Sequence, residues 1–300
     1  MTLNALYDVA APAKLNLFLH VVGRRADGYH LLQSLFVLID WCDRLQFERR
    51  GDGRLARHDF GPALPADDLC LRAARALQAQ SGTTLGADIS IAKTVPWGAG
   101  MGGGSSDAAS TLLALNRLWG LNWPRARLLA LGLTLGADVP FFVGGRNAIV
   151  EGIGERLTPV AVPAQWLAVV KPPAGIETRA IFGSPLLVRN TEAAILESFA
   201  ANGQQSDQQE GIGEIMTPGF GANDLQAAAE AECAQVVQAA SALHQQFGNS
   251  RMTGSGSAVF ARAGTGGQPS AAMPADLAPG WVGRMCRSLS EHPLVGWAAD

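Results

Sequence analysis

The feature that most constrains this 300-residue chain is a glycine-rich run between an expected strand and an expected helix. The run is Pro96-Trp97-Gly98-Ala99-Gly100-Met101-Gly102-Gly103-Gly104-Ser105-Ser106, with five glycines in the seven residues 98–104. Before it, residues 87–93 alternate between apolar and polar side chains, which predicts a strand. After it, residues 106–118 place leucines at helical spacing, which predicts a helix. The fold must therefore bring a strand end, a glycine turn and a helix N-terminus together.

Glycines in this setting favour the binding of a phosphate group. Without Cβ atoms, backbone N–H groups can approach an anion closely, and the helix N-terminus adds unpaired N–H donors and a partial positive charge. The hydroxyl groups of Ser105 and Ser106 could bond a phosphate oxygen or a Mg²⁺ ion. The run lacks Gly-Lys-[Ser/Thr], so it does not predict a P-loop NTPase. The alternative to phosphate binding is a flexible turn capped by the serines. The number of glycines in the run disfavours this alternative.

Composition and charge exclude several classes of function. Hydrophobic residues make up 48% of the chain, which is ample for a core, and the net charge of −3 gives little support to nucleic-acid binding. Four scattered cysteines indicate free thiols rather than a metal site or a disulfide framework. The sequence shows neither a leader pattern nor an apolar run of membrane-spanning length, so we expect a cytoplasmic protein with no membrane partner. We also expect a monomer or a weak homodimer, because no coiled-coil pattern or long apolar edge is present.

The remaining chain mixes strands and helices without a regular alternation, which predicts an α+β fold. We expect Asp68 to cap a helix over 67–81 and a Gln/Gly-rich surface loop at 201–221. A break near 159–163 suggests a boundary between residues 1–162 and 163–300. We expect further helices at 125–135 and 223–247, and another element of secondary structure that begins at 178. The other expected strands are 9–22, 29–39, 43–48, 139–143, 148–151 and 166–171, with a strand–turn–strand unit at 251–263.

Two charged residues stand in apolar surroundings. Lys14 lies in the segment Ala-Pro-Ala-Lys-Leu-Asn, where a buried ammonium group must be paired or functional. Asp138 lies in Leu-Gly-Ala-Asp-Val-Pro-Phe, a setting typical of a catalytic base or an ion-pair partner. The residues themselves leave plainer alternatives open: a solvent-facing lysine on an edge strand, and an aspartate that caps a turn before Pro140.

Taken together, these segments resemble the GHMP kinases over nearly the whole chain. The three motifs of that superfamily are matched by Pro12-Ala13-Lys14-Leu15-Asn16-Leu17, by Pro96 to Ser106 continuing through Asp107-Ala108-Ala109, and by Met252 to Phe260. Two further segments, at 23–30 and 135–141, match a narrower group within the superfamily. The combination is specific because no single motif has to carry the resemblance.

The resemblance implies a small-molecule kinase. Its fold would be two-domain α+β, with a ribosomal-protein-like half over 1–162, a ferredoxin-like half over 163–300 and the active site in the cleft between them. Lys14 and Asp138 match the catalytic pair, and Pro96 to Ser106 match the ATP loop. The implied reaction uses ATP and Mg²⁺ and phosphorylates the 2-hydroxyl of a cytidine-diphosphate-linked methylerythritol, in the non-mevalonate route to isoprenoid precursors.

The resemblance also implies a set of substrate contacts. Tyr29 and His30 match positions that hold a cytosine, and Phe182 matches an aromatic residue that stacks on it. Asn16 and Thr178 match further contacts to the substrate. An aromatic face suits a pyrimidine ring physically, although simple core packing would also explain either Tyr29 or Phe182 alone.

Two alternatives remain on the sequence alone. One is another GHMP kinase, acting on mevalonate, homoserine or a sugar, and the segment Gly28-Tyr29-His30 argues against it. The other is a non-catalytic nucleotide-binding protein, which the presence of both Lys14 and Asp138 argues against.

Overall fold

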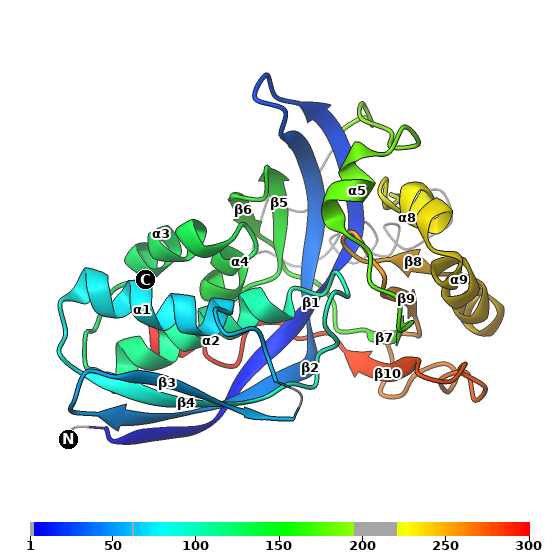
Figure 1. The fold of residues 1–300 in the computed structure, drawn as a ribbon. Coiled ribbons are helices and arrows are strands. Elements are labelled where there is room, and N and C mark those ends of the chain that lie inside the picture. The colour runs from blue at the N-terminus through cyan, green and yellow to red at the C-terminus, as the bar shows by residue number, and fades with distance from the viewer. Residues whose placement is uncertain (1–2, 62, 195–220) are drawn as a thin grey trace.

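The computed structural model describes residues 3–61, 63–194 and 221–300, and these form two antiparallel-rich sheets with helices packed on them (Figure 1). The first sheet has six strands in the order β3-β4-β2-β5-β6, with β1 paired to β2. The second has four strands in the order β10-β7-β9-β8. This is the predicted α+β class. The predicted loop at 201–221 lies outside the described residues except for Gly221.

A long hairpin of β1 (Ala5–Arg24) and β2 (His30–Arg50) runs through the molecule and contacts both halves (Figure 1). The middle of β1, from Val9 to Val21, is buried without interruption. The two strands expected at 29–39 and 43–48 are in fact one continuous strand. The pairing of β1 with β2 shifts register several times, and bulges of this kind let a long strand bend and twist around a core.

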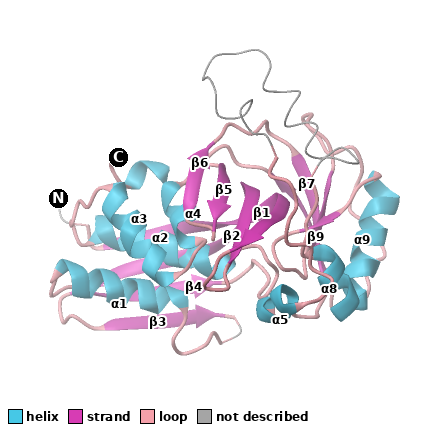
Figure 2. Ribbon diagram, turned by 90° about the horizontal axis from the view of Figure 1, so that it is seen from above, coloured by secondary structure: helices cyan, strands magenta, loops and turns pink. Residues whose placement is uncertain are grey.

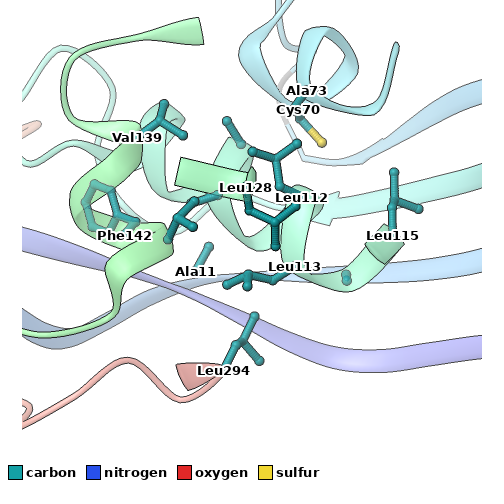
Figure 3. Close-up of a cluster of buried hydrophobic side chains, with 14 of the residues drawn as sticks. Ala11, Cys70, Ala73, Leu112, Leu113, Leu115, Leu128, Val139, Phe142 and Leu294 are labelled. Atoms are coloured by element: carbon teal, nitrogen blue, oxygen red, sulfur yellow. The ribbon is translucent and has the colours of Figure 1, made fainter. Parts of the chain in front are cut away.

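Helices cover one face of the first sheet, as the view from above shows (Figure 2). They are α1 (Leu69–Ser81), α2 (Gly103–Leu118) and α3 (Arg125–Leu135). Their leucines meet the strands in one buried cluster (Figure 3). The expected cap of α1 is confirmed, since the Asp68 carboxylate accepts a hydrogen bond from the Leu71 N–H at 3.0 Å. The remaining strands of this sheet are β3 (Leu55–Phe60), β4 (Gly86–Ala92), β5 (Ala148–Gly152) and β6 (Arg156–Pro159).

The expected strand at 139–143 is wrong, because these residues form the short helix α4 (Val139–Gly144). Val139 to Val143 are all buried, so the segment shows no helical alternation of apolar and polar residues. Pro140 near the helix start supplies a φ angle suited to the first turn, where a missing N–H is harmless. Packing against α2 and α3 then overrides the strand preference of valine and phenylalanine.

The second sheet consists of β7 (Trp166–Lys171), β8 (Arg251–Met252), β9 (Val259–Arg262) and β10 (Val282–Arg287). Beside it lie α5 (Thr178–Gly183), α8 (Gln226–Glu232) and α9 (Ala234–Phe247), so the single helix expected over 223–247 is interrupted at Cys233. Strands β3, β6 and β10 were not predicted. The final residues, with the 3₁₀ turn Val295–Trp297, return to the first half, where Leu294 joins its core (Figure 3). The division at 162/163 falls between β6 and β7 and stays a prediction.

Within the described ranges, no helix is long and apolar enough to cross a membrane. The four cysteines are free thiols, and Cys70 and Cys286 are buried.

Candidate active site

The glycine run joins β4 to α2 and starts the helix three residues earlier than expected, at Gly103. Gly102 precedes it with a φ angle of 70°, a conformation that side chains other than glycine rarely adopt. A Cβ atom on Gly102 would lie 2.9 Å from the Phe142 ring and 3.3 Å from Cε of Lys14. The missing side chain at Gly102 therefore permits both the positive φ angle of the turn and the close packing of Phe142 and Lys14 against it. As a result, the N-terminus of α2 lies beside Lys14.

A second glycine loop, between β8 and β9, packs directly on the first. The N–H of Ala258 donates to the carbonyl of Ala99 at 3.2 Å. A Cβ atom on Gly100 would lie 2.2 Å from the carbonyl oxygen of Thr253, and one on Gly254 would lie 2.8 Å from the carbonyl oxygen of Gly100. Two segments about 150 residues apart in the chain thus touch through their backbones, and together they form one wall of the site.

Lys14 is buried, with its side chain 4% exposed, so the solvent-facing alternative is excluded. Its Nζ atom donates to Oδ1 of Asn16 at 2.6 Å and to the carbonyl of Gly100 at 3.0 Å, and it lies 3.8 Å from Oδ2 of Asp138. It also stands 4.5 Å from the centre of the Phe36 ring. Burial lowers the pKa of Lys14, and the charge of Asp138 opposes that effect.

Asp138 stands immediately before α4, and its side chain makes no capping hydrogen bond there. The alternative reading of Asp138 as a turn cap therefore finds no support in the described contacts. Its carboxylate is 31% exposed and lines a cavity together with Lys14. A partly exposed carboxylate beside a buried cation can accept a proton from a bound hydroxyl group.

The hydrogen bonds around Asn16 determine which way its amide group points. The hydroxyl of Ser34 donates its only hydrogen to the carbonyl of Phe18, so it can only accept from Nδ2 of Asn16, at 2.9 Å. Oδ1 of Asn16 is thereby directed at Lys14, and it also accepts from the hydroxyl of Thr253 at 3.2 Å. Asn16 thus holds the lysine directly, in addition to lining the cavity.

The predicted site residues fall into three neighbouring cavities. One of about 290 Å³ contains Lys14, Asn16, Asp138, Thr178 and Phe182 with both glycine loops. A second of about 320 Å³ is lined by Leu69, Lys93 and the run from Pro96 to Ser105. A third of about 770 Å³ holds Tyr29, His30 and Phe182. Phe182 belongs to the first and the third cavity, and Gly98, Gly100 and Gly102 belong to the first and the second, so the three cavities adjoin one another.

At the third cavity the ring stacked on Phe182 is that of His30, with ring centres 5.0 Å apart and an interplanar angle of 29°. Tyr29, which immediately precedes β2, is 61% exposed. Burial lowers the pKa of His30, and the nearby cations Arg189 and Arg24 lower it further. The cavity therefore presents a neutral imidazole and an aromatic face.

Ser106 lines none of these cavities. Its hydroxyl is buried and has no hydrogen-bond partner among the described residues, which leaves its lone pairs available. The described ranges contain no group of three or more His, Cys, Asp or Glu side chains that could hold a metal by themselves. Magnesium in nucleotide sites is commonly held by one or two side chains and the substrate's phosphates, and the unpartnered Ser106 hydroxyl near the start of α2 is an oxygen donor of that kind.

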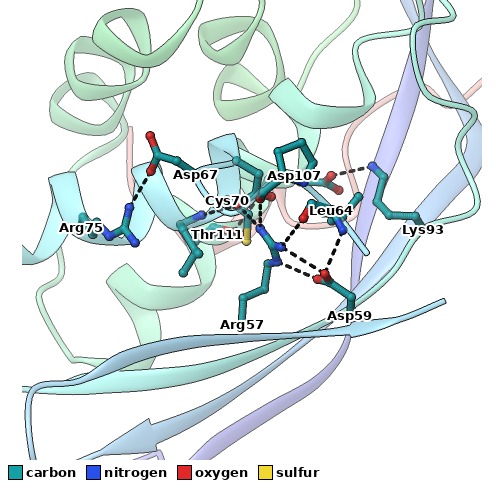
Figure 4. A network of polar contacts seen from close by, with 12 residues as sticks. Arg57, Asp59, Leu64, Asp67, Cys70, Arg75, Lys93, Asp107 and Thr111 are labelled. Carbon is teal, nitrogen blue, oxygen red and sulfur yellow. Dashed lines mark hydrogen bonds and ion pairs between the residues drawn. The ribbon is translucent and has the colours of Figure 1, made fainter. Parts of the chain in front are cut away.

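Beneath the glycine run, a buried ion cluster that was not predicted braces the start of α2. Lys93 lies between two aspartates. It pairs with Asp107 at 2.6 Å (Figure 4) and with Asp43. Asp43 also accepts from the N–H groups of Thr94 and Val95, at 2.6 and 2.8 Å. This cluster joins β2, the residue that follows β4 and the N-terminal part of α2, and so supports the loop.

Several residues of the site were not predicted from the sequence. Thr253 could have been predicted, because it lies within the third superfamily motif, Met252 to Phe260. Ser34, Phe36 and Lys93 could not, because each gains its role only from pairing between segments distant in the chain. Thr178, which was predicted, shares a hydrogen bond of 2.7 Å with Ser255 and so ties α5 to the third motif.

Comparison with known proteins agrees with this geometry. Residues 68–146 match the family model of the GHMP kinases N terminal domain. The solved structure of a homoserine kinase from Cytophaga hutchinsonii superposes with a TM-score of 0.68 over 96% of both chains at 16% identity, which shows a shared fold. The fold and the two glycine loops around Lys14 thus define the class: this chain is a GHMP kinase.

Proteins with higher sequence identity to this chain identify its family within the GHMP kinases. The chain is 66% identical to 4-diphosphocytidyl-2-C-methyl-D-erythritol kinase of Methylibium petroleiphilum over 99% of this chain and 100% of that protein. A crystal structure of 4-(cytidine 5'-diphospho)-2C-methyl-D-erythritol kinase superposes with a TM-score of 0.69 and 36% identity, covering 85% of this chain and 89% of the other. The chain belongs to the 4-diphosphocytidyl-2-C-methyl-D-erythritol kinase family.

Proposed function

We propose that this chain transfers the γ-phosphoryl group of ATP to the 2-hydroxyl of 4-diphosphocytidyl-2-C-methyl-D-erythritol, a step of the non-mevalonate route to isoprenoid precursors. The observation that carries the proposal is a row of adjoining cavities in which Lys14 and Asp138 stand between the glycine loops and an aromatic cavity. The family membership supports the choice of substrate. We further propose that the protein acts in the cytoplasm as a monomer or weak homodimer.

In this proposal the run from Pro96 to Ser106 holds the phosphates of ATP. Its backbone N–H groups and the N-terminus of α2 supply donors and a partial positive charge. Mg²⁺, held by the phosphates with the Ser106 hydroxyl, would neutralise charge on the transferring group. The transferred phosphoryl group needs little covalent help from the protein, so accurate positioning supplies much of the catalysis.

Asp138 is proposed as the base that accepts the proton of the attacking hydroxyl group. Lys14, 3.8 Å away, contributes positive charge at the reacting centre. Asn16 and the carbonyl of Gly100 keep the ammonium group in place. Tyr29, His30 and Phe182 are proposed to hold the cytosine, and Thr178 to contact the remainder of the substrate.

The test is an assay of ADP release by the purified protein with three acceptors: the cytidylyl substrate, mevalonate and homoserine. We expect turnover with the first and none above background with the others. Turnover only with mevalonate or homoserine would contradict the substrate assignment. Inactivity with all three, in protein shown to be folded and to bind ATP, would leave only a nucleotide-binding protein.

A further inference from the structure

The guanidinium group of Arg189 lies behind the aromatic cavity and joins its two sides. Its Nε–H donates to Nε2 of His30 at 3.2 Å. Its Nη2 group donates to the carbonyls of Phe182 and Ser184, at 3.2 and 2.9 Å, and Nη1 donates to that of Leu187 at 3.1 Å. One side chain thus connects the first residue of β2 to the end of α5.

This contact determines where the proton of His30 resides. A guanidinium group has five donors and no acceptor, so Nε2 of His30 must present a lone pair to Arg189. A neutral imidazole then carries its hydrogen on Nδ1. The lowered pKa of His30, caused by burial and by Arg189 and Arg24, agrees with a neutral ring. The hydrogen bond that the His30 ring makes to a described residue is the one through Nε2.

His30 therefore offers a ligand one donor and no acceptor. A cytosine ring has an edge with two acceptors, N3 and O2, and an exocyclic amino group that only donates. A donor-only histidine matches the acceptor edge and opposes the amino group. The same guanidinium holds Phe182 by its carbonyl, so the stacking face and the hydrogen-bond donor are positioned together.

We propose that Arg189 is the positioning residue of the base site: it fixes His30 as an Nδ1–H donor toward the N3/O2 edge of the pyrimidine and holds Phe182 in stacking position. Arg189 does not line the cavity, so it acts through these two residues and not by touching the substrate. The inference rests on the proposed function of this cavity as the cytidine site.

The kinetic test uses Arg189→Lys and Arg189→Met. Lysine keeps the charge but loses the fork of donors, and methionine keeps most of the length. For both we expect the KM of the cytidylyl substrate to rise by about 10- to 100-fold, the range for losing a charged hydrogen-bond network. The kcat value and the KM of ATP should change less than about threefold, because the cavity of Lys14 and Asp138 is untouched. Arg75→Met is the control, since Arg75 is exposed on α1 and forms its ion pair, within the described part of the chain, with Asp67.

The second measurement needs no turnover. Long-range ¹H–¹⁵N NMR spectra of the wild-type protein report the tautomer of each histidine, and assignment by a His30→Gln variant identifies the signal of interest. We expect the Nδ1–H form for His30 in the wild type and a shift toward the Nε2–H form in Arg189→Met. Binding of CDP as a probe should weaken in that variant while binding of ADP does not.

Two results would overturn the inference: an Nε2–H tautomer of His30 in the wild-type protein, or unchanged KM and CDP affinity in folded Arg189 variants. If the variants fail to fold, the wild-type tautomer alone decides. Wild-type protein that is inactive with the cytidylyl substrate would contradict the proposed function instead, while the NMR measurement would still test the contact between Arg189 and His30.

Discussion

A buried ammonium group is unfavourable unless oxygen atoms surround it, and oxygen atoms of Asn16, Gly100 and Asp138 lie near Nζ of Lys14. Two, from Asn16 and Gly100, are hydrogen-bond acceptors at 2.6 and 3.0 Å, whereas the carboxylate of Asp138 is 3.8 Å away. The closer oxygens belong to groups that do not titrate. Asp138 is thus close enough to interact electrostatically with Lys14, and its carboxylate remains available to take a proton from a substrate.

At the residue scale, Asp138→Asn separates binding from chemistry. The amide has the shape of the carboxylate and cannot accept the proton, so we expect kcat to fall by roughly 10²- to 10⁴-fold. The affinity for ATP should stay within about threefold, because the glycine loops remain intact. Rapid-quench phosphoryl transfer and calorimetric ATP binding measure the two effects. Asp67→Asn, at an exposed carboxylate on the approach to α1, is the matched control. An Asp138→Asn enzyme with near-normal kcat would show that Asp138 is not the base.

At the scale of elements, Gly102→Ala tests whether the first glycine loop requires close approach or merely a positive φ angle. Gly82→Ala is the matched control: Gly82 ends α1 with a φ of 66°, and a Cβ atom there would meet no described atom within 4 Å. A Cβ atom at Gly102 would instead meet the Phe142 ring at 2.9 Å. Strain alone costs about 1 kcal/mol at either site, and overpacking adds about 1–3 kcal/mol at Gly102. Urea unfolding of both variants measures the difference. Equal losses of stability would mean that the loop needs glycine only for its backbone angle.

The elements also show what local sequence can predict. The glycine loop, its flanking strand and helix, and the cap of α1 by Asp68 follow from neighbouring residues, and the structure confirms them. Helix α4 was mistaken for a strand because all five residues from Val139 to Val143 are buried, which removes the periodic signal. Strand β10 was missed because Arg284 and Arg287 give it the polarity of a loop, and it is a strand through its pairing with β7.

The same limit applies to the site. Sequence motifs identified Lys14, Asp138 and both glycine loops, and these line one cavity. Ser34, Phe36 and Arg189 could not be found, because their roles depend on which segments meet in space. Arg189 contacts His30 across 159 positions of the chain, a pairing that no local pattern reports.

At the scale of the whole molecule, the last residues return from the second sheet and bind the first half. Arg125, at the start of α3, donates to the carbonyls of Val143 and Ala298 at 2.8 and 2.9 Å. The end of α4, the start of α3 and the tail thereby meet at one guanidinium group. Asp138 lies between α3 and α4. The C-terminal residues therefore pack against the part of the fold that carries the proposed base.

His292 anchors this returning tail. Its backbone N–H donates to the carbonyl of Gly145 at 2.8 Å, and its Nδ1 accepts from the N–H of Leu294 at 3.0 Å. The ring is buried, and burial together with the charge of Arg125 lowers its pKa to about 3. In the unfolded chain the His292 imidazole therefore takes up a proton near pH 6.5, whereas in the folded protein it stays neutral until the pH approaches 3. The stability contributed by His292 is complete above pH 6.5 and is lost as the pH falls toward 3.

His292→Asn tests this linkage, because the amide oxygen can still accept from the N–H of Leu294 and does not titrate. Between pH 7 and pH 4 the wild type should lose about 3 kcal/mol of unfolding free energy through this residue, which the variant should retain. Urea titrations at pH 7, 5.5 and 4 compare the two proteins, and equal m-values establish that both unfold the same surface. The variant should be the less stable at pH 7, because the smaller side chain leaves a cavity, and the gap should narrow or reverse at pH 4. A constant gap across the three pH values would mean that protonation of His292 does not loosen the tail.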